Sequence, residues 1–60
     1  MAVAKFALRP DPEHPGYQTI MADRGGRWYV VRGGKFTCRQ NDAEIARMAK
    51  RGISVERRKP

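Results

Sequence analysis

The sequence predicts an α+β fold in which a small antiparallel sheet carries one helix on one face, in the order β-β-β-β-α-β. Stretches rich in alternating or β-favouring residues, as expected of half-buried strands, occupy residues 3–9, 17–22 and 27–32. Two glycine pairs, at 25–26 and 33–34, mark turns within this region. A later stretch spaces its apolar residues as a helix does and ends at a glycine.

The first strand is expected at residues 3–9, because Phe6 and Leu8 alternate with Lys5 and Arg9. Residues 10–16 contain three prolines and a glycine. Proline removes a backbone donor and glycine has no preferred conformation, so this segment is expected to be an extended loop.

The next three strands are expected to form two successive hairpins. Residues 17–22 and 27–32 flank a turn at residues 23–26, and Gly33-Gly34 is the signal for a two-residue turn with positive φ at both positions. A fourth strand is therefore expected from Lys35 to Cys38 or Arg39.

The helix is expected to begin at an N-cap of Asn41 or Asp42, with Glu44 completing a capping box from Asn41. Its inner face is expected to carry Ile45, Met48 and Ala49. Gly52 is the expected stop. Residues 53–56 alternate and predict a last short strand.

Length and charge limit the function. The chain has 60 residues, 40% of them apolar, and a net charge of +7. We expect residues 1–60 to form a single small basic domain with residues 57–60 as a frayed tail. A domain of this size buries only about 60% of its unfolded surface, which leaves little room for a deep substrate pocket. We therefore expect no enzyme activity.

Candidate catalytic and metal-binding residues are few. Cys38 and His14 are the only cysteine and histidine, so no zinc site is expected, and no other cofactor is implied. Cys38 is expected to be a small core residue, with a reactive thiol as the alternative. His14 has no serine nucleophile placed for it. The chain contains no phosphate-loop motif, no signal peptide and no apolar run long enough to span a membrane, so a cytoplasmic location is expected.

The expected hairpins sort the strand residues into two faces. The helix is expected to cover the first, which carries Ile20, Tyr29, Val31, Phe36 and Cys38, together with Phe6 and Leu8. The second face carries Tyr17, Thr19, Met21, Trp28, Val30, Arg32, Lys35, Thr37 and Arg39. An aromatic surface with cations is typical of sheets that hold single-stranded nucleic acid, and of protein docking surfaces. The alternative is that Trp28 and Met21 form a second small core under the proline loop.

The candidate partner-binding residues are Arg24, Arg27, Trp28, Arg32, Lys35 and Arg39. They lie in or near a short internal repeat, in which Arg-Gly-Gly is followed by a basic and an aromatic residue at 24–28 and again at 32–36. This repeat is either two glycine turns or a recognition motif of the kind that binds RNA. A secondary basic patch is expected from Arg47, Lys50, Arg51, Arg57 and Arg58, the alternative being an ordinary solvated helix face.

The segments Gly34–Thr37, Asp42–Ala46 and Arg51–Ile53 resemble the strand, cap, short helix, glycine and strand that end many small phage and prophage proteins. The resemblance implies an accessory protein, such as an assembly factor or an inhibitor of bacterial defence of the anti-CRISPR type. Inhibitors that mimic DNA are acidic, so mimicry does not fit this basic chain.

Together these observations predict a non-enzymatic basic module that binds nucleic acid or a nucleoprotein complex. The alternative is a phage-encoded inhibitor or assembly factor that docks on an acidic protein surface. Neither a membrane nor a small-molecule substrate is expected as a partner.

Overall fold

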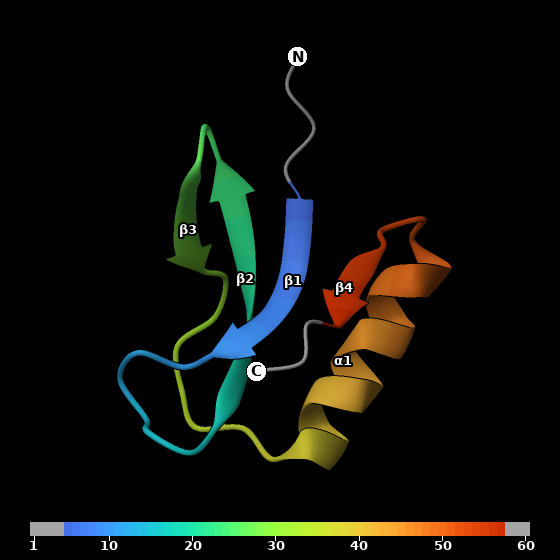
Figure 1. Ribbon diagram of the computed structural model, residues 1–60. Helices are drawn as coiled ribbons and strands as arrows, with labels where there is room; N and C mark the ends of the chain where they lie inside the picture. Colours follow the sequence, from blue (N-terminus) through green and yellow to red (C-terminus); the bar gives the residue numbers. More distant parts are fainter. Residues whose placement is uncertain (1–4, 58–60) are drawn as a thin grey trace.

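A computed structural model describes residues 5–57, which form a four-stranded sheet with one helix against one face (Figure 1). The elements are β1 (Lys5–Pro10), β2 (Gln18–Arg24), β3 (Arg27–Val30), α1 (Cys38–Lys50) and β4 (Val55–Arg57). The strand order is β3-β2-β1-β4, with β1 antiparallel to β2 and parallel to β4. The predicted α+β class is confirmed, but the sheet is mixed rather than antiparallel throughout.

The hairpin between β2 and β3 turns at Gly25 and Gly26, whose φ values of 60° and 85° fit a type I′ turn. The carboxylate of Asp23 accepts a hydrogen bond of 2.9 Å from the Gly26 N–H. A loop of residues 23–26 would pair Ala22 with Arg27 and Ile20 with Tyr29. In the structure Ala22 lies opposite Tyr29 instead, so the register differs by two residues. Because side chains alternate with a period of two, the shift leaves each of them on its expected face.

The predicted fourth strand is wrong. Residues 31–37 form a connection, and the helix already begins at Cys38. Gly33-Gly34 makes no hairpin because only Gly34 has a positive φ, of 126°. Instead, the Phe36 ring folds back so closely that a Cβ on Gly34 would lie 3.2 Å from it. The residues predicted to lie on the fourth strand, Lys35 to Arg39, therefore take no part in the sheet.

The helix begins earlier than its expected N-cap. The Thr37 hydroxyl accepts a 3.2 Å hydrogen bond from the Gln40 N–H, and the Gln40 side chain accepts one of 2.8 Å from the Thr37 N–H. This capping box replaces the expected one at Asn41 or Asp42. Cys38 consequently lies exposed in the first turn and is not a core residue. The helix ends at Lys50, and Gly52 follows the C-cap with a positive φ of 82°, as predicted.

The core lies between α1 and the strands β1, β2 and β4. Leu8, Ile20 and Met48 are buried at its centre, and around them pack Phe6, Ile45, Ile53 and Val55. Ala49 was expected on the inner helix face but is exposed. Arg57, expected in a frayed tail, lies in β4 opposite Leu8. Residues 58–60 fall outside the described part of the chain.

The buried residues of α1 are Asn41 and Met48, so the inner face of the helix includes Asn41 and not Ala49. Asn41 is 1% exposed. The Asn41 amide donates a 2.8 Å hydrogen bond to the Gln18 carbonyl at the start of β2 and accepts one of 3.5 Å from Arg32. An early helix start therefore allows this amide to join the helix to the sheet and to the preceding connection.

Replacing Asn41 with alanine is expected to lower the free energy of unfolding by about 1–3 kcal/mol, because the Gln18 carbonyl loses its partner inside the protein. The matched control is Asp42→Ala, which breaks an exposed ion pair with Arg57 and is expected to change stability by about 0–1 kcal/mol. Urea unfolding followed by far-UV circular dichroism measures both. Equal midpoints for the two variants would contradict the role given to Asn41.

Candidate functional site

The helix-free face of the sheet is not the open aromatic surface that was expected. The Arg9 guanidinium reaches from β1 across β2 and lies 4.6 Å from the centroid of the Trp28 ring on β3. Ala7 and Thr19 on this face are both 0% exposed, and Met21 is 8% exposed. Trp28 lies on this face as predicted, but half-buried beneath an arginine. Met21 is buried on this face, as the alternative of a second small core required, but the buried apolar cluster of residues 5–57 lies on the other face around Ile20.

Arg32 and two residues of the secondary patch, Arg47 and Arg57, are paired with acidic side chains of α1. Arg32 stacks at 3.7 Å on the Phe36 ring and lies 3.9 Å from Glu44. Arg47 bonds the same carboxylate at 2.6 Å, which lowers the pKa of Glu44. Arg57 pairs at 2.7 Å with Asp42, and Arg58 lies outside the described residues. Arg32 thus does not face Lys35 across a hairpin, as the predicted second turn required.

Lys35 and Arg39 lie at a distance from the hairpin turn. The Lys35 ammonium lies 4.9 Å from the centroid of the Tyr17 ring, and Arg39 is exposed in the first turn of α1. The start of α1 is at the opposite end of the molecule from the β2–β3 turn (Figure 1). The predicted cluster therefore divides, with Arg24 and Arg27 at one end and Lys35 and Arg39 at the other.

The proline loop contains the one histidine, which contacts a buried carboxylate. The Nδ1 atom of His14 lies 2.8 Å from Oδ2 of Asp11, and Oδ1 accepts a 2.9 Å hydrogen bond from the Glu13 N–H. That backbone hydrogen bond, with the His14 contact, lowers the pKa of Asp11. These bonds fold the loop onto itself. Within residues 5–57, no group of three His, Cys, Asp or Glu side chains is placed to hold a metal.

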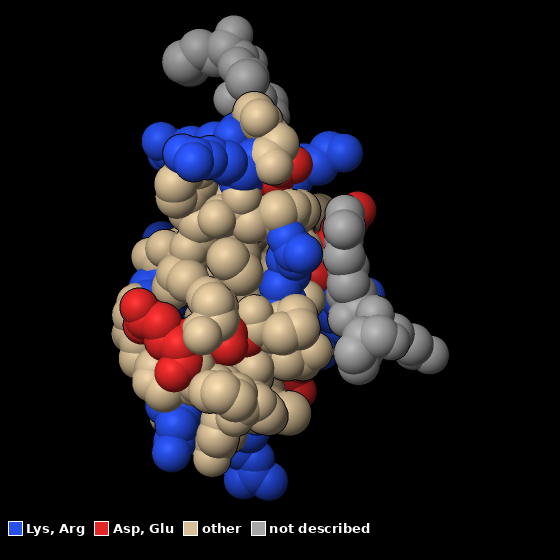
Figure 2. Space-filling view, turned by 60° about the vertical axis from the view of Figure 1, so that its left-hand side comes forward, with Lys and Arg blue, Asp and Glu red and all other residues tan. Residues whose placement is uncertain are grey.

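Five basic residues lie in three chain segments towards one end of the molecule, with the β2–β3 turn and the end of α1 on opposite sides of β1 (Figure 1). The start of β1, the β2–β3 turn and the end of α1 all lie there (Figure 1). We call this set the basic end; it comprises Lys5, Arg24, Arg27, Lys50 and Arg51. All five are exposed, and none forms an ion pair with another described residue. Figure 2 shows most of the basic side chains at the top and bottom of this face, with a few acidic atoms beside the upper group and a larger acidic group at the lower left.

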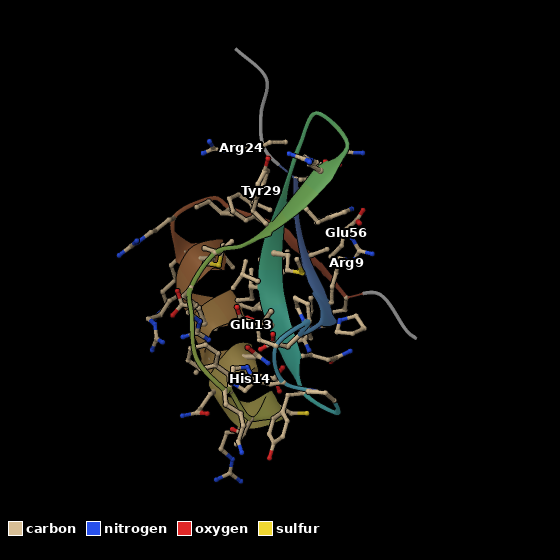
Figure 3. All side chains as sticks on the ribbon, turned by 90° about the vertical axis from the view of Figure 1, so that its left-hand side faces the viewer. Arg9, Glu13, His14, Arg24, Tyr29 and Glu56 are labelled. Atoms are coloured by element: carbon tan, nitrogen blue, oxygen red, sulfur yellow. The ribbon has the colours of Figure 1, made fainter. Side chains whose placement is uncertain are left out.

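A groove adjoins the basic end on the helix side of the sheet. It is lined by Phe6, Ala22, Arg24, Tyr29, Val30 and Val31. Tyr29 is 47% exposed and Val31 is 48% exposed, although both were expected beneath the helix. Figure 3 shows Arg24 and Tyr29 on the helix side of the sheet, and Arg9 on the other side. Beside the basic end, the exposed aromatic residue is thus Tyr29 rather than Trp28.

Comparison with protein-family models, with curated proteins and with solved structures finds no match to this chain. No helix in the described residues is long and apolar enough to cross a membrane. The features of the described residues that bear on function are the basic end and the groove beside it.

Sequence reasoning missed Tyr29 and Lys5 as site residues. Tyr29 was placed correctly on the helix side, but the helix was assumed to cover the whole sheet. The width of a single helix could have corrected this assumption. A helix about 10 Å wide covers roughly two strands spaced about 4.8 Å apart, which leaves part of a four-stranded sheet exposed.

Proposed function

We propose that the protein is a non-catalytic module that binds nucleic acid, free or within a nucleoprotein complex, through the basic end. The observation that supports this most is the concentration of five exposed Lys and Arg residues at one end without an acidic ion-pair partner in residues 5–57. Phosphate groups are the natural partner of such a cluster, because guanidinium donors match phosphate oxygens in geometry and charge.

The affinity of such a module falls with salt, because each phosphate contact releases counterions. We expect the logarithm of the binding constant to fall by about 0.7 per contact for each tenfold rise in salt with single strands, and by about 0.9 with duplex. Fluorescence anisotropy of a labelled oligonucleotide, from low to physiological salt, measures this slope.

The Lys50→Gln/Arg51→Gln double variant is expected to reduce the slope by about one to two units, since it removes two of the proposed contacts. The control is Lys35→Gln/Arg39→Gln, which removes the same charge at the other end and is expected to leave the slope nearly unchanged. Circular dichroism first confirms that both variants fold, because Lys50 and Arg51 also complement the helix dipole by about 0.3–1 kcal/mol. Absence of binding at low salt would refute the proposal.

The alternative is docking on a protein, as implied by the resemblance to phage accessory proteins. It is favoured by the exposed apolar residues of β3 and its continuation, Tyr29, Val30 and Val31, on a strand at the edge of the sheet. A protein captured from bacterial lysate in the presence of nuclease, and lost with the variant Val31→Asp, would support this alternative over nucleic-acid binding.

A further inference from the structure

We propose that the groove beside the basic end receives an unpaired nucleobase, so that the module prefers single-stranded to duplex nucleic acid. This inference rests on the proposed function and names the form of nucleic acid that the same site takes. It places the base on the groove and the adjoining phosphates on the arginines of the β2–β3 turn.

The groove has the form that a flat base requires. Phe6 pairs with Ala22, and Ala22 pairs with Tyr29, so the three side chains lie in line across the helix side of the sheet. Two strand spacings separate the backbones of Phe6 and Tyr29 by roughly 10 Å. Between Phe6 and Tyr29 lies Ala22, whose small side chain lines the groove although the residue is only 8% exposed. A planar apolar surface with an aromatic ring on either side is suited to stacking.

The helix does not fill this space. Its inner residues Ile45 and Met48 pack around Leu8 and Ile20, which form the next pair on the same face, two residues further along the strands. The Val31 N–H donates a 3.2 Å hydrogen bond to the Ile20 carbonyl, so Val31 lies beside Ile20 at the outer edge of this second row. The exposed fractions of Tyr29 and Val31, 47% and 48%, follow from this placement.

The two arginines at the β2–β3 turn make one end of the groove positively charged. Arg24 lines the groove and lies directly opposite Arg27 across the hairpin. Like charges on directly opposed residues repel, which destabilises a sheet in the absence of an anion. A phosphate between the two guanidinium groups would relieve this repulsion. An anion is thus favoured two residues along the strands from the surface where the base would stack.

A duplex does not fit this arrangement, because its bases are already stacked and paired and present only their edges. A single strand can place one base on Tyr29 while its backbone follows the basic end. Stacking on one aromatic residue tolerates any base, so we expect little sequence preference beyond stacking strength.

The test compares three labelled probes by fluorescence anisotropy: an oligothymidylate of about ten nucleotides, the same phosphodiester chain without bases, and a duplex of equal length. We expect the protein to bind the oligothymidylate most tightly. Tyr29→Ala should weaken this binding by about 5- to 150-fold, the range expected for loss of one base stack. Tyr29→Phe keeps the ring and should bind as the original protein does.

Two further variants separate a local effect from general damage. Tyr17→Ala removes another exposed tyrosine, from the distant end that carries Lys35, and should leave affinity unchanged. Ala22→Val adds methyl groups to the groove floor while favouring strand structure, and should weaken binding to the oligothymidylate but not to the base-free strand.

The inference is overturned if the base-free strand or the duplex binds as tightly as the oligothymidylate, or if Tyr29→Ala has no effect. In either case salt-dependent binding would still support the proposed function. If none of the probes binds at low salt, the proposed function fails and the inference fails with it.

Discussion

Replacing Ile20 with alanine is expected to leave most of the protein unfolded at room temperature. Ile20 is 1% exposed at the centre of the only buried cluster in residues 5–57, where it packs with Leu8 and Met48. Truncating a buried isoleucine to alanine destabilises a protein by about 2–5 kcal/mol. A core of this size supplies only about 3–5 kcal/mol in total, so one substitution removes most of the stability.

The control for Ile20 is its neighbour across the hairpin. Val31 donates a backbone hydrogen bond to the Ile20 carbonyl but is 48% exposed. Val31→Ala is expected to change the free energy of unfolding by about 0.5 kcal/mol or less, as is usual at exposed positions. Thermal unfolding followed by circular dichroism compares the variants. A cooperative transition for Ile20→Ala close to that of Val31→Ala would show that the core lies elsewhere.

Reversing both arginines of the hairpin turn, Arg24→Glu/Arg27→Glu, is expected to reduce affinity for single strands by at least about fiftyfold at 0.05 M salt. The estimate takes about 0.7 logarithmic units per phosphate contact for each tenfold change in salt, referred to about 1 M, where the ionic contribution vanishes. Each contact then contributes roughly eightfold, and the new carboxylates add repulsion.

The double reversal Lys35→Glu/Arg39→Glu changes the net charge by the same amount at the other end of the molecule. It should weaken binding by a much smaller factor, through the general field alone. If the two double variants lose equal affinity, binding depends on net charge and the basic end has no special role. Native-like circular dichroism of both variants is required for the comparison.

The elements that sequence reasoning predicted correctly are those determined by local chemistry. Gly25-Gly26 forms a tight turn because both positions need positive φ, and Gly52 ends the helix for a similar reason. The helix start was wrong because Thr37 with Gln40, and Asn41 with Glu44, are both acceptable caps locally. The choice between them depends on the Gln18 carbonyl, which Asn41 reaches only from inside the helix. A single sequence does not reveal that long-range hydrogen bond.

The candidate site was predictable only in part. Arg24 and Arg27 were placed correctly because they flank the glycine turn. Lys50 and Arg51 were assigned to a separate patch, since their arrival at the same end depends on the parallel pairing of β4 with β1. The second glycine pair misled the prediction for Arg32, Lys35 and Arg39, because its sequence suits a hairpin while Phe36 packs back against it.

The pairing of β1 with β4 has a consequence for synthesis on the ribosome. Phe6 lies opposite Val55, so this contact joins one of the first described residues to one of the last and forms only after both have been synthesised. Until residues 53–57 have left the exit tunnel, β1 lacks one neighbour and its apolar side chains lack Ile53 and Val55. Contacts between such distant parts of a chain also slow folding, because a long loop must close before they form. The domain is therefore expected to complete its fold only once residues 53–57 have left the tunnel and paired with β1.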